Sequence, residues 1–256
     1  KERGDMEKGN LQKYLKYPII IYNFFLLIFN KIVSQVHYLD PSQNTRKRII
    51  SSLIMIPVAL IAIFASQKLF IFLAILIAVL MAFEWSEMSR NMPNQNKWRT
   101  IGFFYITIPI YCAISLRILD DQIIFWMFSI IWATDIFAFF AGRSLGGPKI
   151  APTISPNKTW SGLIGGVLAS MMIGLISTFA FPGSWLFFIT VSVLISLVEQ
   201  ASDLTESKFK RIFGVKDSGT IIPGHGGVLD RLDGMIFVAP LVYFLTKIFP
   251  SQFGLV

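Results

Sequence analysis

The sequence predicts an all-α integral membrane protein, a bundle of about seven to nine transmembrane helices around a polar cavity that faces the cytoplasm. Three observations lead to this fold class. Of the 256 residues, 54% are hydrophobic and only 15% are charged, which is too apolar for a soluble globule. Apolar runs recur at the length of about 17–25 residues that a helix needs to cross a bilayer. Basic residues gather in alternate loops between these runs, a pattern typical of cytoplasmic loops.

We expect residues 1–44 to be an N-terminal extension and residues 45–256 to form a single membrane-embedded domain. Within the extension, residues 17–33 are apolar but interrupted by Asn23 and Asn30. This segment either spans the membrane or lies on its surface. We favour a surface helix, because a spanning one would leave five basic residues on the outer side. No small-residue cleavage site follows it, so it does not resemble a signal peptide.

Firmer hydrophobic segments follow the extension, and each is expected to be a helix. They cover residues 49–66, 69–85, 101–116, 123–141, 161–181, 185–201 and 235–249. If the basic linker before them is cytoplasmic, fourteen basic residues lie in cytoplasmic loops and three (Lys68, Arg117 and Lys247) lie outside. The net charge of +8 therefore indicates membrane topology and not nucleic-acid binding. The single cysteine, Cys112, excludes an intrachain disulfide and a multi-cysteine metal site.

The stretch from residue 203 to residue 234 is dense in charged residues and glycines, between two apolar segments. If the preceding helix continues past Gln200, then Asp203, Ser207 and Lys210 fall at positions i, i+4 and i+7 and share one face. Asp230 and Asp233 are three residues apart at the start of the next apolar segment, again on one face. Carboxylates from two helices are suited to Mg²⁺, which prefers oxygen ligands and often bridges substrate phosphates.

The run Pro-Gly-His-Gly-Gly at residues 223–227 cannot lie inside a helix. Its backbone N–H groups lead into the start of a helix, where anions bind readily. We therefore expect this run to form an anion cradle.

The same stretch resembles the signature of the phosphatidate cytidylyltransferases (CDP-diacylglycerol synthases), without a gap from Ser207 to Asp233. The shared pattern is Ser-x-hydrophobic-Lys-Arg, four residues, Lys-Asp-x-Gly, and then His-Gly-Gly-x-x-Asp-Arg-x-Asp. A chance match over such a length is negligible, whereas a lone Gly-x-Gly would mean little. One departure is Ser202, where the family usually has glycine. We expect Ser202 to tighten the backbone near Asp203.

The resemblance implies that CTP and phosphatidic acid become CDP-diacylglycerol and pyrophosphate, with Mg²⁺ as cofactor. Whether a second cation binds is left open. The implied partners are CTP, phosphatidic acid and the lipid bilayer, and a homodimer is left open. Asp203 and Asp230 are expected to be the principal metal ligands, assisted by Asp233 and Ser207, and Lys210 completes the catalytic set. The expected substrate-binding residues are Ser155, Lys158, Thr159, Arg211, Lys216, Asp217, His225, Gly226, Gly227 and Arg231.

Two upstream positions complete the expected site. Asp135 lies inside an apolar segment, where a carboxylate is costly and usually faces a polar cavity. Its segment resembles the family's Ala-Thr-Asp motif, so Asp135 is expected to hold a second cation or to shape the cavity; hydration near the membrane surface is the alternative. Residues 155–162 resemble the motif Ser-Pro-x-Lys-Thr-x-x-Gly and suit phosphate contacts. Their alternative role is to turn the chain and cap a helix.

The remaining acidic residues are expected to play lesser roles. Glu84 and Glu87 are interpreted as a solvated helix cap. Glu199 and Gln200 either support the site or mark the membrane interface, and Glu206 and Asp217 neutralise neighbouring bases. Three other functions compete with the cytidylyltransferase: a CTP-dependent polyprenol or phytol kinase, a CDP-alcohol phosphotransferase, and a cation-coupled transporter that uses Asp135 and Asp203. The transporter would not need the glycine-rich basic loop, and the phosphotransferase motif Asp-Gly-x-x-Ala-Arg is absent from the sequence.

Overall fold

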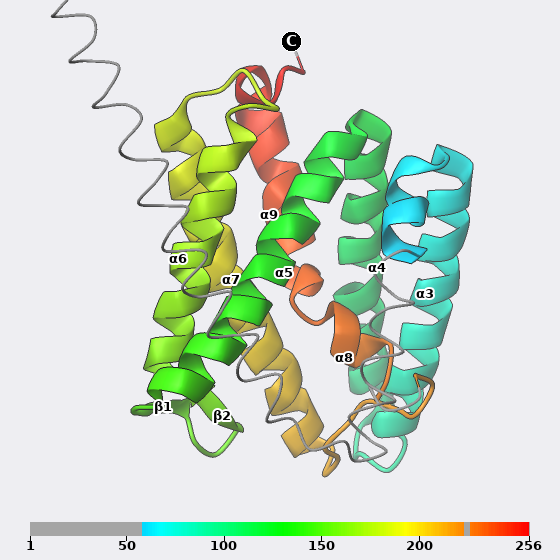
Figure 1. Ribbon diagram of the computed structural model, residues 1–256. Coiled ribbons are helices and arrows are strands. Elements are labelled where there is room, and N and C mark those ends of the chain that lie inside the picture. The colour runs from blue at the N-terminus through cyan, green and yellow to red at the C-terminus, as the bar shows by residue number, and fades with distance from the viewer. Residues whose placement is uncertain (1–57, 223–225, 256) are drawn as a thin grey trace, which may run out of the picture. The chain divides into compact units, whose positions relative to one another are not determined.

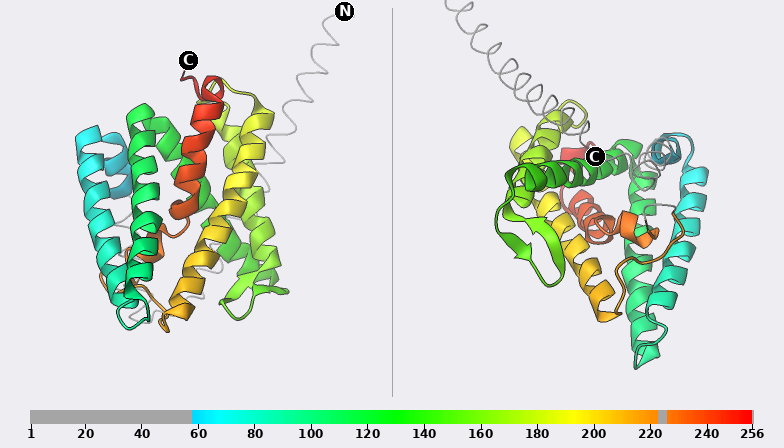
Figure 2. Two further views of the ribbon diagram at one scale, coloured as in Figure 1. Left: turned by 180° about the vertical axis from the view of Figure 1, so that it is seen from behind. Right: turned by 60° about the horizontal axis from the view of Figure 1, so that its bottom comes forward.

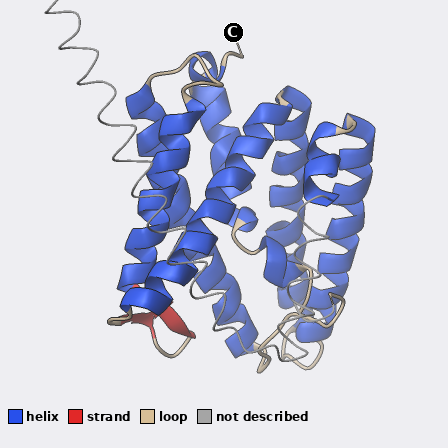
Figure 3. Ribbon diagram, in the orientation of Figure 1, coloured by secondary structure: helices blue, strands red, loops and turns tan. Residues whose placement is uncertain are grey.

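The computed structural model describes residues 58–222 and 226–255, and it is helical along most of that length (Figures 1 and 3). The predicted extension of residues 1–44 and the predicted site residue His225 lie outside the described residues. Residues 58–64 are helical. The elements that follow are α3 (Gln67–Met88), α4 (Gln95–Leu119), α5 (Asp121–Leu145), β1 (Lys149–Ala151), β2 (Ser155–Thr159), α6 (Trp160–Ser177), α7 (Trp185–Ile212), α8 (Leu229–Leu232), α9 (Met235–Ile248) and η1 (Pro250–Phe253).

Five of these helices, α3 to α7, are long and apolar enough to cross a membrane. Their outer faces carry exposed apolar side chains such as Phe72 (63%), Val79 (60%) and Phe103 (61%). Lipid tails accept such a surface, whereas water does not. The chain is therefore a helical membrane protein, as predicted. Helix α9 has 14 residues, fewer than the roughly 20 that span a bilayer. The described residues thus establish five candidate spans and not the predicted seven to nine.

Short polar side chains cap the N-termini of four of the described helices. Ser66, Asp120 and Ser184 accept hydrogen bonds from backbone N–H groups two or three residues further on, at 3.1, 2.6 and 3.2 Å. Thr159 accepts one from the N–H of Gly162 at 3.1 Å, at the start of α6. Each cap pairs an N–H group that the first helical turn leaves without a partner. The capping role considered for Thr159 is therefore confirmed.

A two-stranded antiparallel hairpin joins α5 to α6, where the sequence analysis expected only a loop. The N–H of Ile154 donates to the carbonyl of Ala151 at 3.2 Å, closing a four-residue turn with Pro152 at its second position. Proline fixes the φ angle that this position requires. The all-α prediction holds for the bundle but missed the hairpin, because strands this short show no readable alternation of side chains.

Small residues allow α5 and α6 to pack closely. A Cβ atom at Gly166 would lie 3.0 Å from the backbone oxygen of Thr134, and one at Gly162 would lie 2.8 Å from that of Ala138. Helices in membranes commonly associate through such small residues, because no hydrophobic effect drives them together there. This packing fixes α6, and the hairpin before it, against α5.

An aromatic cluster joins α3, α4 and α7. The ring centroids of Trp85 and Phe209 are 5.1 Å apart, and those of Trp98 and Phe213 are 5.0 Å apart, both edge to face. Gly102 makes room for the indole of Trp85, since a Cβ atom there would lie 2.3 Å from the ring. Each such ring pair contributes about 0.5–1.5 kcal/mol beyond its burial. The cluster holds the last turn of α3 beside the charged end of α7.

The loops that carry the sequence motifs lie together at one end of the bundle. In Figure 1 the α3–α4 connection, the hairpin and the α7–α8 connection are all at the lower end, and Figure 2 brings that end forward. The short helix α8 lies further into the bundle, and α9 runs from it to the opposite end. The alternation of basic and non-basic loops in the sequence requires this shared end.

Candidate active site

Helix α7 continues through the charged stretch to Ile212 and does not end near Gln200. The hydroxyl of Ser207 donates to Asp203 Oδ1, one turn away, at 3.3 Å. Lys210 extends to Asp230 of α8, with 2.7 Å between Nζ and Oδ1. The predicted face of α7 with Asp203, Ser207 and Lys210 therefore exists. It is directed toward the segment that carries Asp230 and Asp233.

Three carboxylates form an acidic group at the centre of the site. One oxygen from each of Asp203, Glu206 and Asp233 lies within 4.8 Å of the others. Asp203 and Glu206 belong to α7, whereas Asp233 directly follows α8. Glu206 is fully buried, and the two aspartates are half-buried. Carboxylate oxygens that converge from two segments are suited to a hard divalent cation such as Mg²⁺.

Two lysines from different elements balance part of this negative charge. Lys158 of β2 places Nζ 2.6 Å from Asp203 Oδ2 and donates to Gln200 Oε1 at 2.9 Å. Lys210 of α7 places Nζ 2.9 Å from Glu206 Oε2. The hairpin that the sequence analysis missed is thus the element that brings Lys158 to the acidic group.

Asp230 has different surroundings from the acidic group. Besides its ion pair with Lys210, its Oδ2 accepts hydrogen bonds from the N–H groups of Ser218 and Gly227, both at 2.9 Å. Gly226 has φ +86°, a left-handed conformation that favours glycine. A Cβ atom there would lie 2.6 Å from Asp230 Oδ2. Asp230 therefore organises the glycine-rich loop, which runs from residue 217 to residue 228.

Glu84 belongs to this site, although the sequence analysis interpreted it as a solvated helix cap. That interpretation is wrong, because Glu84 is only 2% exposed. Its carboxylate accepts hydrogen bonds from the N–H groups of Val228 and Leu229, both at 2.8 Å. Within the predicted anion cradle, the N–H of Gly227 is thus bound by the protein's own Asp230, and Glu84 binds the N–H groups of the two residues that follow the cradle. No local pattern could reveal Glu84, since these partners lie 144 and 145 residues away.

The pKa values of Asp233 and Asp230 are shifted in opposite directions. Burial raises the pKa of Asp233 well above its usual range, and the negative charges of Asp203 and Glu206 raise it further. Burial also raises the pKa of Asp230, but the hydrogen bonds from Lys210 and the loop outweigh burial, so the pKa is lowered. Asp230 already has its counter-charge, whereas a divalent cation would relieve the repulsion at Asp233.

Ser202 stands where the family resemblance leads us to expect glycine, and it connects α7 to α9. Its hydroxyl donates to the backbone oxygen of Asp233 and accepts from the N–H of Phe237 at 3.3 Å. Phe237 lies in the first turn of α9, which has no side-chain cap of its own at Gly234. Ser202 thus links two helices and fixes the backbone of Asp233, whereas the expected tightening near Asp203 stays a prediction.

Asp135 of α5 is connected to the acidic group through a series of polar contacts. Its carboxyl shares a hydrogen bond with Glu199 of α7. Glu199 also accepts from Gln200 Nε2 at 2.9 Å, and Gln200 in turn binds Lys158. Glu199 is buried, whereas Asp135 remains accessible. The structure thus places Glu199 and Gln200 behind the site, in the supporting position that the sequence analysis considered.

The other predicted substrate-binding residues in the described part of the chain belong to the hairpin, to the end of α7 and to the segment between α7 and α9. Arg211 is exposed, and its guanidinium donates to the carbonyl oxygens of Ile154 and Val215, at 3.2 and 3.3 Å. It therefore ties the turn of the hairpin to the end of α7. The rest lie on the hairpin or between α7 and α9: Ser155, Lys216, Asp217, Gly226, Gly227 and Arg231.

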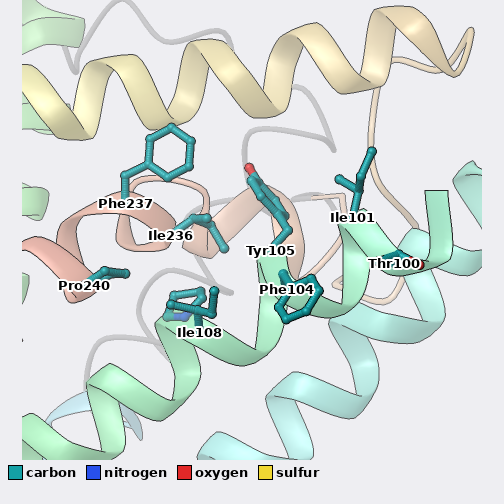
Figure 4. Close-up of a pocket in the computed structure, with 9 residues that line it drawn as sticks. Thr100, Ile101, Phe104, Tyr105, Ile108, Ile236, Phe237 and Pro240 are labelled. Atoms are coloured by element: carbon teal, nitrogen blue, oxygen red, sulfur yellow. The ribbon is translucent and has the colours of Figure 1, made fainter. Parts of the chain in front are cut away.

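An apolar cavity of about 430 Å³ lies beside the polar site, between α4 and α9. It is open to the surroundings and is lined by Phe104, Ile108 and Phe237 among others. Figure 4 shows Tyr105 at its edge, with the hydroxyl directed toward α7. The ring of Tyr105 contacts Phe209 of α7, at a centroid distance of 5.4 Å. The cavity therefore leads from the apolar surface toward the helix that carries the acidic group.

Known proteins with similar sequences are all cytidylyltransferases in the comparisons that follow. The model of the Cytidylyltransferase family matches residues 100–249, which include the acidic group. A phosphatidate cytidylyltransferase of Rickettsia bellii is 39% identical over 216 residues, which cover 80% of this chain and 92% of the relative. One of Rickettsia felis is 38% identical over 221 residues, with 82% and 96% covered. One of Brucella abortus is 44% identical over 180 residues, with 67% and 63% covered.

The family model thus matches more than half of the chain, and each of these relatives covers about two thirds of it or more. The matched region also holds all three carboxylates of the acidic group and both lysines that pair with them. The chain therefore belongs to the cytidylyltransferase family.

Proposed function

We propose that the chain transfers CMP from CTP to phosphatidic acid and releases pyrophosphate, as a phosphatidate cytidylyltransferase. An oxygen of the lipid phosphate attacks the α-phosphorus of CTP. The bond from that phosphorus to the bridging oxygen breaks, and pyrophosphate leaves with that oxygen. The observation that carries the proposal is the acidic group with Lys158 and Lys210 beside it, inside a membrane-protein bundle.

The main obstacle to this reaction is repulsion, because both substrates are polyanions. The attacking phosphate oxygen is already ionised, so no strong general base is needed. Lys158 and Lys210 are assigned to the phosphate groups of the substrates, since their ammonium groups lie at the acidic group from two sides. Neutralising and positioning charge is the usual route to catalysis in phosphoryl transfer.

A divalent cation fits the acidic group. The oxygens of three carboxylates converge there, and the pKa of Asp233 is raised by burial and then by the negative charges of Asp203 and Glu206. Asp203, Glu206 and Asp233 would hold the cation, and Mg²⁺ is the cation that their hard oxygen ligands favour. When bound, it supplies charge neutralisation and Lewis-acid polarisation at the phosphates.

Asp230 is assigned to anchoring Lys210 and the glycine-rich loop. This differs from the principal metal role that its sequence position suggested. Its carboxylate already accepts hydrogen bonds from one ammonium and two backbone N–H groups. Asp135 is assigned to shaping the polar cavity, because its carboxyl is bonded to Glu199. The other predicted substrate contacts, and any second cation, stay predictions.

The end of the bundle that carries the hairpin and the glycine-rich loop is assigned to the cytoplasm. The loops at this end are rich in basic residues, as cytoplasmic loops are. In this arrangement the polar cavity opens to the cytoplasm, and residues 45–256 form one membrane domain. The membrane segments expected at residues 49–66 and 235–249 stay predictions, because the first lies partly outside the described residues and α9 has only 14 residues.

Single cysteines at Asn94 and Thr220 should react from the same side of the membrane, in a chain whose Cys112 has been replaced by alanine. Both positions are exposed and lie in the two loops at the shared end. A cysteine at Ala180, exposed in the loop between α6 and α7 at the opposite end, should react only from the other side. The measurement is labelling by a membrane-impermeant thiol reagent in vesicles of both orientations. Labelling of Asn94 and Thr220 from opposite sides would refute the arrangement.

The lipid is proposed to enter sideways, with its phosphate at the acidic group and one acyl chain in the cavity between α4 and α9. The cavity is apolar and open, as a tail that arrives from the bilayer requires. Tyr105 lies between the cavity and α7, so a chain in the cavity would leave the headgroup near the charged residues.

Replacing Ile108 by tryptophan should raise KM for phosphatidic acid several-fold and leave KM for CTP unchanged, because the larger ring fills part of the cavity. The matched control is Phe103→Trp, on the same helix but on its outer face, where the side chain is 61% exposed. Steady-state kinetics in mixed micelles measure both constants. An unchanged KM for the lipid in the Ile108 variant would exclude the cavity as the site of the tail.

Turnover of CTP by the purified protein tests the function itself. With phosphatidic acid as acceptor, we expect CDP-diacylglycerol and pyrophosphate in equal amounts, dependent on a divalent cation. A CTP-dependent polyprenol kinase would instead convert a prenol to its phosphate and release CDP. Turnover with a prenol and none with phosphatidic acid would overturn the proposal.

A further inference from the structure

The carboxylate of Glu84 is buried against the glycine-rich loop. The proposed reaction assigns no role to Glu84. It is 2% exposed and lies near the end of α3, before the region that the family model matches. Oε1 accepts from the N–H of Val228, and Oε2 accepts from that of Leu229, both at 2.8 Å. The hydroxyl of Ser218 lies 3.3 Å from Oε2. One side chain of α3 thus binds the loop at both of its ends.

Two glycines of the loop are shaped around this carboxylate. A Cβ atom at Gly219 would lie 2.8 Å from Glu84 Oε1, and one at Gly227 would lie 2.6 Å from the same oxygen. Any larger residue would displace the carboxylate from its N–H partners. Part of the glycine requirement of this loop therefore comes from an internal anion, and not only from a substrate phosphate.

A continuous set of contacts leads from Glu84 to the acidic group. Ser218, whose hydroxyl is at Glu84, donates its backbone N–H to Asp230 at 2.9 Å. Asp230 holds the ammonium of Lys210 at 2.7 Å, and Lys210 reaches Glu206 at 2.9 Å. The position of Lys210 between Asp230 and Glu206 thus depends on the loop, and the loop is fixed from the other side by α3.

We propose that Glu84 is a positioning residue for the cytidylyltransferase reaction, holding the glycine-rich loop so that Asp230 fixes Lys210 beside the acidic group. The inference rests on the proposed function. If the loop is released, Asp230 no longer neutralises Lys210. The ammonium then adds uncompensated positive charge next to Glu206, which weakens cation binding at the acidic group. A purely structural role would reduce the amount of folded protein and leave the cation requirement of the folded fraction unchanged.

Glu84→Gln is the decisive variant, because it keeps the size of the side chain and replaces one acceptor oxygen by an N–H₂ group that faces N–H donors. We expect kcat to fall by about 10- to 100-fold, the range typical of residues that support a metal site from behind its ligands. The Mg²⁺ concentration for half-maximal rate should rise several-fold. The matched control is Glu87→Gln, three residues further on the same helix, where the carboxylate is 52% exposed; both quantities should match those of the wild type.

Other outcomes are equally informative. A folded Glu84→Gln variant with the wild-type Mg²⁺ requirement would overturn the inference, whether or not its kcat falls. If this variant does not fold, Ser218→Ala decides: it removes the hydroxyl contacts with Glu84 and with the N–H of Asp230 but leaves both backbone hydrogen bonds to Glu84. Ser218→Ala should shift the Mg²⁺ requirement in the same direction by a smaller factor, and no shift would refute the inference. An inactive wild-type enzyme would instead refute the proposed function.

Discussion

Asp203→Asn should reduce turnover of CTP by about 10²- to 10³-fold or more, while the protein still folds. Asparagine keeps the shape of the side chain but loses its charge. The acidic group would lose one of its three carboxylates, and Lys158 would lose its ion-pair partner at 2.6 Å. The measurement is kcat at saturating CTP, phosphatidic acid and Mg²⁺. Asp121→Asn, at the opposite end of the bundle, serves as the control and should keep full activity.

The dependence of the rate on Mg²⁺ concentration separates the two aspartates that follow the glycine-rich loop. If the acidic group holds the cation, Asp233→Asn should raise the Mg²⁺ requirement more than Asp230→Asn does. The opposite ranking would make Asp230 the principal ligand, as its place in the sequence suggested. Wild-type activity in Asp203→Asn would remove the acidic group from the mechanism altogether.

Lys210→Ala should lower kcat by about a hundredfold, whereas Arg211→Ala should have only a mild effect. The two residues are neighbours in sequence but point in different directions from α7. Lys210 Nζ lies between Asp230 and Glu206. The guanidinium of Arg211 is instead bound to backbone carbonyls at the edge of the site. Replacing Lys210 removes positive charge where two anions have to meet.

Both lysine and arginine variants should be measured at saturating Mg²⁺ and CTP, so that the comparison reports the chemical step. Arg211→Ala acts as the matched control, since it removes one positive charge from the same turn of the same helix. A larger loss in the arginine variant would mean that the charge balance of the acidic group does not limit the reaction. It would also contradict the assignment of Lys210 to a substrate phosphate.

Much of this architecture could be predicted because it depends on local sequence patterns. Apolar runs located the helices, and the spacing of Asp203, Ser207 and Lys210 predicted a shared face on condition that the helix continues past Gln200. The contacts that join distant segments could not be predicted in this way. The ion pair of Lys158 with Asp203 depends on a hairpin whose strands have three and five residues. Glu84 has its partners 134 to 145 residues away.

The roles of Asp230 and Asp233 show a second limit. Both are aspartates of one motif, three positions apart, and nothing in their spacing distinguishes a loop anchor from a metal ligand. The difference comes from neighbouring groups. Backbone N–H groups of the loop bind one carboxylate, whereas the other lies among like charges. Glu206 lies four residues before Lys210, a spacing that indicates an ion pair between the two. Only the fold shows that Glu206 also belongs to the acidic group.

The contact between α3 and the glycine-rich loop also has a consequence for biosynthesis. Glu84 and Leu229 are 145 residues apart, and at about 5–20 residues per second the ribosome needs roughly 7–30 s to make the chain between them. During this interval α3 has already left the ribosome, but the N–H groups of Val228 and Leu229 have not yet been made. The carboxylate of Glu84 therefore has to be hydrated at the membrane surface. Its place in the last turn of α3, at the loop end of the bundle, permits that hydration. The glycine-rich loop and its contact with the acidic group therefore assemble late in synthesis, although Glu84, which holds the loop, is made much earlier.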